Sequence, residues 1–123
     1  MDFDALRAYL LAKPEAVETF PFGPGTHVFK VKNKMFALIG WNNDALMINL
    51  KCDPDEAIAL CDIFSSITPG YHMDKKHWVS VYFNQSTEQH IPNGEIKRLM
   101  DNSFMLVVDK LLKHEQTSIL LHM

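Results

Sequence analysis

The fold is decided by residues 26–51, which read THVFKVKNKMFALIGWNNDALMINLK. Side chains in residues 26–32 alternate between two faces, as in a β-strand with one buried side. Residues 35–41 are almost continuously apolar, which is typical of a central strand, and residues 45–51 form a third strand. The connections between these strands are short, so neighbouring strands must run antiparallel. This segment therefore predicts a three-stranded antiparallel meander.

Helix-start signals flank the meander. Asp2 can cap a helix that runs to about Ala12, and Lys13-Pro14 ends it because the residue before a proline avoids the helical region. Residues 15–25 are rich in proline and glycine and predict a loop. After the meander, Asp53-Pro54-Asp55-Glu56 predicts a second helix, with an aspartate cap, a proline at the first position and a glutamate that closes a capping box.

The rest of the chain predicts a second hairpin and two more helices. Together the elements follow the order α-βββ-α-ββ-αα.

We expect a two-layer α+β fold, in which helices pack on one face of a single antiparallel sheet. The other face should be partly solvated and should carry Lys30 and Lys32. The elements expected after residue 64 are a break at 65–70, a hairpin over 71–83 that turns at 74–76, a loop over 84–90, a helix from Ile91 that stops at 101–103, and a helix over 104–113 capped by Ser103.

Length, charge and cysteine usage narrow the class of protein. The 123 residues suffice for one domain with its own core, and we expect a single domain over residues 1–123. The net charge of −3 at pH 7 weighs against tight nucleic-acid binding, because nucleic-acid-binding domains are usually basic. Cys52 and Cys61 lack the spacing of a redox or metal motif and are expected to be structural thiols. Without a signal segment or a membrane-length apolar run, we expect a cytoplasmic protein that makes no membrane contact.

No catalytic signature occurs in the chain. A G-x-S-x-G nucleophile elbow and glycine-rich phosphate loops are both missing from the sequence. His72 and His77 could face each other across a hairpin, but Asp74 is expected at the turn tip, facing water, and such a metal site needs three converging ligands. We therefore predict no catalytic residues, no metal and no cofactor. An enzyme whose site is assembled from distant residues stays as an alternative.

Residues 69–78, PGYHMDKKHW, form the other distinctive segment. Two adjacent lysines, two histidines and two aromatic rings stand here in front of an alternating strand. A second positive cluster comes from three lysines in residues 26–34, a segment that holds no acid. Lysines attract phosphates, and a ring such as that of Trp78 can stack on bases. The same features have structural explanations, because strand lysines discourage aggregation and Trp78 can anchor a core.

Residues 69–82 resemble the hallmark of the MmcQ/YjbR-like family, a P-x-x-H-M/L-N/D-K-x-H-W core followed by a strand. Asn102-Ser103-Phe104 is similar to a downstream element of these proteins, and Lys13-Pro14 and Asp53-Pro54 are similar too. The resemblance implies a compact two-layer fold akin to small secretion-chaperone-like domains. It also implies DNA binding through two hairpin wings. The residues that match the motif are His72, Lys75, His77 and Trp78.

We expect a small protein that binds DNA weakly, and with a steep salt dependence, through the positive face of its two hairpins. The lysines would touch phosphates, and the histidines and the tryptophan would shape the second hairpin. The alternative is a protein- or peptide-binding module of chaperone type without a nucleic-acid role, in which seven methionines would suit an adaptable surface. The expected nucleic-acid-binding residues are Lys30, Lys32, Lys34, His72, Lys75, Lys76, His77 and Trp78.

Overall fold

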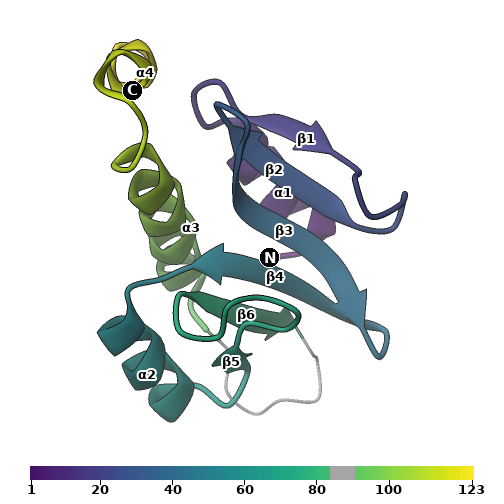
Figure 1. Ribbon diagram of the computed structural model, residues 1–123. Helices are drawn as coiled ribbons and strands as arrows, with labels where there is room; N and C mark the ends of the chain where they lie inside the picture. Colours follow the sequence, from purple (N-terminus) through teal and green to yellow (C-terminus); the bar gives the residue numbers. More distant parts are fainter. Residues whose placement is uncertain (84–90) are drawn as a thin grey trace.

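A computed structural model describes residues 1–83 and 91–123 of the chain. Within these ranges, one antiparallel sheet of six strands is combined with four helices (Figure 1). The predicted α+β fold with a single antiparallel sheet is therefore confirmed. The elements are α1 (Phe3–Leu11), β1 (Val17–Thr19), β2 (His27–Val31), β3 (Lys34–Asn42), β4 (Ala45–Lys51), α2 (Pro54–Ile63), β5 (Ile67–Pro69), β6 (Trp78–Phe83), α3 (Asn93–Val108) and α4 (Lys113–Leu120).

The meander predicted from residues 26–51 forms the middle of the sheet, whose strand order is β1-β2-β3-β4-β6-β5. Each of its turns holds two residues with positive φ, 48° at Lys32 and 64° at Asn33, then 50° at Asn43 and 64° at Asp44. Turns of this kind match the right-handed twist of the strands that they join, and Asn and Asp tolerate the left-handed conformation. The turn residues thus help to set the register of β2, β3 and β4.

The sheet also has a short strand at each edge that the sequence does not predict. β1 lies within the expected 15–25 loop and pairs with β2, and β5 lies within the expected 65–70 break and pairs with β6. The hairpin predicted over 71–83 is wrong in its first half, because β6 pairs with β5 and β4 and residues 70–77 form a connection. Three residues are too few to show a strand period, so tertiary pairing decides both edge strands.

Helix α3 runs further than predicted. It continues through residues 101–103, where the sequence predicts a break, and it ends at Val108, so the predicted helix over 104–113 is wrong. Ser103 caps no helix: its buried hydroxyl donates to the Phe36 carbonyl and accepts from the Lys51 N–H at 2.8 Å. Ser103 therefore joins α3 to β3 and β4. The loop expected over 84–90 lies outside the described residues.

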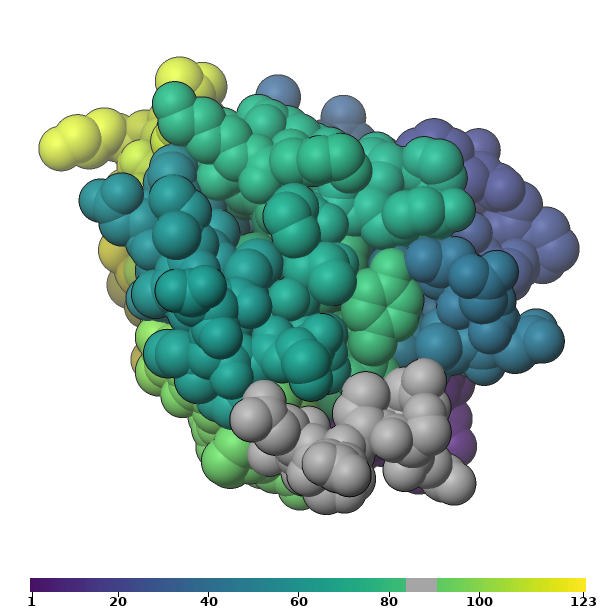
Figure 2. All heavy atoms as spheres, turned by 90° about the horizontal axis from the view of Figure 1, so that it is seen from below, coloured from purple at the N-terminus to yellow at the C-terminus, as the bar shows by residue number. Residues whose placement is uncertain are grey.

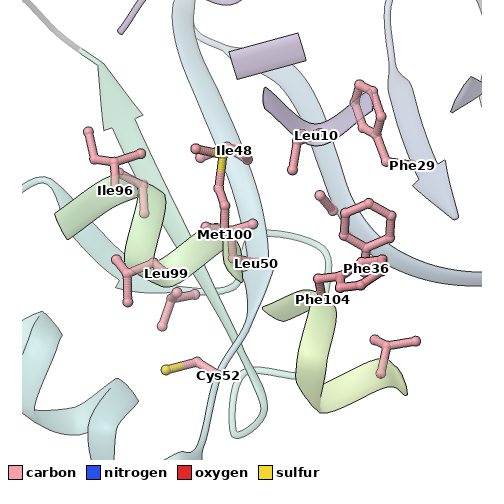
Figure 3. Packing of buried hydrophobic residues seen from close by; sticks show 14 of the residues in the cluster. Leu10, Phe29, Phe36, Ile48, Leu50, Cys52, Ile96, Leu99, Met100 and Phe104 are labelled. Carbon is pink, nitrogen blue, oxygen red and sulfur yellow. The ribbon is translucent and has the colours of Figure 1, made fainter. Parts of the chain in front are cut away.

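All four helices bury side chains against one face of the sheet, which we call the core face. Figure 3 shows this packing, with Leu10 of α1 and Met100 and Phe104 of α3 among side chains from the central strands. The rings of Phe36 and Phe104 meet edge to face, 5.1 Å apart at their centroids. Helix α4 adds the fully buried Ile119. In the described part of the chain, no helix covers the opposite face, which we call the open face.

Candidate functional site on the open face

The open face carries a small apolar cluster of Val28, Leu38 and Met47, with Met35 and Tyr82 packed beside it. The cluster follows from strand geometry, because these residues alternate along β2, β3, β4 and β6 with the side chains of the core face. Because this apolar cluster is much smaller than the core, the open face also carries polar side chains and a loop.

Two buried polar side chains, Asn49 of β4 and Ser80 of β6, are paired across the open face. Ser80 Oγ donates to Asn49 Oδ1 and accepts from the Tyr71 N–H at 2.8 Å. The Asn49 side-chain amide donates to the Tyr71 carbonyl at 3.1 Å. We call this arrangement the Asn49–Ser80 clamp. Because it satisfies both backbone polar groups of Tyr71, it holds residues 70–77, the 70–77 loop, against the open face.

Gly70 lets the 70–77 loop pass close to β6. Its N–H donates to the Trp78 carbonyl at 2.9 Å. A Cβ at position 70 would lie only 2.8 Å from Trp78 Cβ and 3.1 Å from the Trp78 carbonyl oxygen, which leaves no room for a side chain. In the space-filling view the loop lies at the surface beside α2 (Figure 2). The Trp78 backbone and Cβ therefore lie directly against Gly70, where the loop leaves β5 and returns to β6.

His72 is an exposed residue of the 70–77 loop with an unusual backbone conformation. Its φ of 58° lies in the left-handed region, which residues with a side chain rarely adopt. Its ring lies 4.0 Å from the Tyr71 ring, between centroids. Residues held in such conformations are found more often at functional sites than elsewhere. The sequence prediction included His72, but gave no sign of this conformation.

A groove of about 510 Å³ lies on the open face beside the 70–77 loop, and we call it the open-face groove. It is formed by β3 and β4, by the 70–77 loop and by the segment that precedes β2. Sequence reasoning missed it, although a glycine inside the apolar run of residues 35–41 signals such a hollow. The lining residues are Phe22, Thr26, Met35, Leu38, Gly40, Trp41, Met47, Asn49, Tyr71, His72 and Met73.

The two predicted basic segments lie at the same end of the sheet. Ala37 is paired with Leu50, so β3 begins where β4 ends. Lys51 is paired with Trp78, so β6 begins at this end too. The turn between β2 and β3 and the 70–77 loop therefore lie at the same end of the sheet, with β4 between the strands that they precede.

The predicted lysines differ in their surroundings. Lys32 forms an ion pair with Glu15, 2.7 Å between Nζ and Oε1, which offsets its charge. Lys75 donates from Nζ to the Gly70 carbonyl at 3.2 Å and so helps to close the loop. The other three are Lys34 and Lys76, which are exposed, and Lys30, which is half-buried on the open face.

The hairpin histidines do not gather into a metal site. His77 is half-buried, and its carbonyl accepts from the Cys52 N–H at 2.8 Å. Within residues 1–83 and 91–123, no three His, Cys, Asp or Glu side chains are grouped so that they could hold a metal ion, and no helix is long and apolar enough to cross a membrane. Burial raises the pKa of the Cys52 thiol to about 12, which keeps it protonated and unreactive at neutral pH.

Sequence reasoning also missed a polar cluster where β1 meets α1. His27 Nδ1 lies 2.8 Å from Glu18 Oε2, and the Arg7 guanidinium binds the same carboxylate at 2.7 Å. Hydrogen bonds from Arg7 and then from His27 hold the pKa of the Glu18 carboxyl below its usual range. The rings of Phe3 and Phe20 lie 4.7 and 5.0 Å from that of His27. The cluster ties β1 to α1 and β2, and its Phe3 and His27 rings lie 5.5 and 6.1 Å from the ring of Trp41.

A family model described as YjbR matches residues 11–106 of the chain. This range contains the meander, the Asn49–Ser80 clamp and the 70–77 loop. The chain belongs to the YjbR family. The resemblance inferred from residues 69–82 is therefore confirmed.

Relatives share both the sequence and the fold of this YjbR-family chain. The uncharacterized protein YbdF of Escherichia coli O157:H7 is 42% identical over 97 residues, which are 79% of this chain and 76% of that protein. The uncharacterized protein YjbR of Escherichia coli strain K12 is 28% identical over 123 residues, 100% of both chains. The crystal structure of Deinococcus radiodurans protein DR2400, with a DUF419 domain, has a TM-score of 0.83 at 37% identity, over 94% of this chain and 86% of that chain. The crystal structure of a Pseudomonas syringae protein has a TM-score of 0.72 at 28% identity, over 86% of this chain and 98% of that chain.

Proposed function

We propose that this YjbR-family protein binds DNA weakly and without sequence preference, through lysines that contact phosphates at one end of its sheet. The supporting observation is that Lys30 and Lys34, which flank the turn between β2 and β3, lie at the same end of the sheet as Lys75 and Lys76 of the 70–77 loop. Among the described residues, none of these four has a carboxylate at ion-pair distance. Lysines placed in this way attract the phosphate backbone whatever its sequence.

Two features keep the expected affinity low. The net charge of −3 opposes the approach of a polyanion. Lys32 is paired with Glu15, and Asp74 stands next to Lys75 and Lys76 in the loop. We expect a Kd of roughly 10⁻⁴ to 10⁻⁶ M at physiological salt, which weakens steeply as salt is added.

The other predicted residues shape the loop in this proposal. The carbonyls of His77 and Trp78 accept from the N–H groups of Cys52 and Gly70, which fixes the return of the loop into β6. The exposed His72 is the residue of this group that is best placed to touch a ligand. We propose a binding protein and assign no catalytic role to any of these side chains.

A matched pair of charge reversals tests the DNA proposal. Lys76→Glu changes the loop, and Lys97→Glu changes an exposed lysine of α3 whose Nζ lies 5.6 Å from the Tyr9 ring, on the side covered by helices. Each substitution changes the net charge equally, so only the location differs. In anisotropy titrations with a short labelled duplex, we expect Lys76→Glu to weaken binding about tenfold at low salt and to lower the salt slope by about 1. Equal losses of DNA affinity in the two variants would reject the 70–77 loop as the DNA-binding site.

The second candidate is a protein- or peptide-binding role, supported by exposed apolar side chains on α2. Ile58 and Ile63 are 70% and 60% exposed. A hollow of about 460 Å³ beside α2 is lined by Ile58, Pro69 and Lys76 among others. We expect short apolar peptides to shift the amide signals of α2 and Ile58→Ser to suppress those shifts. If no peptide in a varied panel moves these amides, this role is excluded for α2.

A further inference from the structure

We propose that the open-face groove binds a small molecule with a flat apolar body and one anionic group. Its volume of about 510 Å³ falls within the roughly 300–1,000 Å³ of small-molecule sites. Its lining is mostly apolar and aromatic, with a few polar groups at defined places, which is the usual composition of such sites. Phosphate contacts by lysines would not require a groove of this kind.

The floor of the groove is open because β3 carries Gly40 at this point. Gly40 is paired with Met47 on the open face and is the seventh residue of the nine-residue strand β3. A Cβ at position 40 would meet only the Leu38 side chain, at an ordinary contact distance of 3.7 Å. Packing therefore does not demand a glycine here, and glycine weakens a strand interior. The missing side chain leaves space for a ligand to lie against the sheet.

The walls of the groove expose large apolar surfaces. Phe22 is 71% exposed and Trp41 is 47% exposed, and both line the groove, although the Trp41 ring also packs against Phe3 and His27. A flat ligand would bury part of these rings, which is favourable in proportion to the apolar area removed from water. Met35, Met47 and Met73 add flexible, polarizable side chains that pack well against an aromatic body.

Charge at the groove favours an anionic group over a cationic one. Among the described residues, no acid lines the groove, although the chain has 15 Asp and Glu. The hollow between α2 and α3 is different, because Asp53 and Asp109 are among its lining residues. His72 lines the groove, and Lys30 is the cross-strand neighbour of Met35 on the same face. The Lys30 ammonium can draw a negative group toward the groove, and the His72 ring N–H can donate a hydrogen bond to it.

The wall formed by the 70–77 loop is held in place before any ligand arrives. The Asn49–Ser80 clamp fixes the backbone of Tyr71, and His72 follows in its left-handed conformation. Strained conformations persist only where the surroundings enforce them. A preformed wall reduces the ordering that a ligand must impose when it binds.

The strand order favours a small molecule over an extended peptide. β3 and β4 form the floor, and both are internal strands with hydrogen-bonded neighbours on each side. A peptide that binds by strand addition needs an unpaired strand edge, which these two strands do not offer. Recognition in the groove must therefore come from side chains.

Two fluorescent probes with the same apolar body test this proposal. Anilinonaphthalene sulfonate (ANS) carries one anionic group, and N-phenyl-naphthylamine (NPN) is its neutral counterpart. We expect both to bind the wild-type chain at a single saturable site, ANS more tightly than NPN. Binding that fails to saturate, or that requires several sites, would overturn the proposal.

A side chain that fills the floor of the open-face groove should prevent probe binding there. We expect Gly40→Leu to weaken both probes at least about tenfold, because the new side chain occupies the groove. Gly94→Leu is the matched control, since a Cβ at position 94 meets nothing within 4 Å and the residue lies outside the groove. Met73→Asp provides a second disruption at a half-buried loop position and should weaken ANS more than NPN. Unchanged binding of both probes to a folded Gly40→Leu or Met73→Asp variant would refute the site.

The role of His72 can be separated from its backbone conformation. His72→Asn keeps a residue that tolerates positive φ but removes the imidazole. We expect ANS binding to weaken about fivefold and NPN binding to stay unchanged. Equal losses for both probes would reject the anionic preference. Lys76→Glu, which tests DNA contact, should leave NPN binding intact, so failure of one proposal can be told from failure of the other.

Discussion

The two faces of the sheet come from the same strands but have different chemistry. On the core face, Ile48 and Val81 are paired across β4 and β6 and are fully buried. One residue earlier in β4, Met47 is paired with Tyr82 on the open face, and Gly40 beside them leaves a hollow. Helices seal the first face, and a clamped loop shapes the second. Alternation along a strand thus lets one sheet carry both the core and a face with an open groove.

The largest effect on stability should come from Ser103→Ala on the core side. Its hydroxyl bonds to the Phe36 carbonyl and the Lys51 N–H, and its removal leaves two groups without a partner. We expect the free energy of unfolding in urea to fall by about 3 kcal/mol, because each unsatisfied buried group costs about 1–3 kcal/mol. Ser65→Ala, at an exposed serine, should change it by less than about 0.5 kcal/mol. Similar losses in both variants would show that Ser103 does not join α3 to the sheet.

A smaller and more local effect is expected from Asn49→Ala on the open face. The substitution removes one arm of the Asn49–Ser80 clamp, and we expect the free energy of unfolding to fall by about 2 kcal/mol. Amide hydrogen exchange should rise in the 70–77 loop far more than in β2 and β3. Asn102→Ala, at an exposed residue of α3, serves as the control. A uniform rise across the sheet would mean that the clamp supports the whole fold and not the loop.

The smallest effect concerns the acid stability of the polar cluster at β1. Hydrogen bonds, first from Arg7, lower the pKa of Glu18 in the folded state. Ionised Glu18 therefore stabilises the fold at any pH above its unfolded-state pKa, and this stabilisation is lost as the pH falls through its folded-state pKa. At neutral pH, Glu18→Gln should lower the Tm by about 4 °C. Once the pH lies below the folded-state pKa of Glu18, the Tm values of mutant and wild type should converge.

Asp62→Asn, at an exposed carboxylate of α2, is the control for this pH profile. Its Tm should stay close to that of the wild type at every pH. A Tm difference between Glu18→Gln and wild type that stays constant as the pH falls would contradict the lowered pKa of Glu18.

Local patterns in the sequence were enough to predict the centre of the fold. The meander follows from strand alternation and from short turns at Asn33 and Asn43, which are local properties. The edge strands β1 and β5 could not be predicted, because three residues carry no period and depend on their partners. Ser103 misled the prediction, since its capping tendency is local but its bonds reach residues 67 and 52 positions away.

The candidate site was predictable only in part. The two basic segments seen in the sequence do reach the same end of the sheet, but Lys32 is paired with Glu15, and a joint role of the other lysines in binding stays a prediction. The open-face groove depends on how the 70–77 loop folds back over the sheet. That path is fixed by long-range bonds from Asn49 and Ser80 to Tyr71, which no local pattern reveals.

A methionine-methyl NMR titration with ANS gives the most direct test of an open face suited to binding. Met35, Met47 and Met73 line the open-face groove, whereas Met100 is fully buried on the core face. We expect the three groove methyl signals to shift together and to saturate, while the Met100 signal stays in place. If Met100 shifts as much as the groove methionines, or if the three groove signals do not move, the open face is not the binding surface.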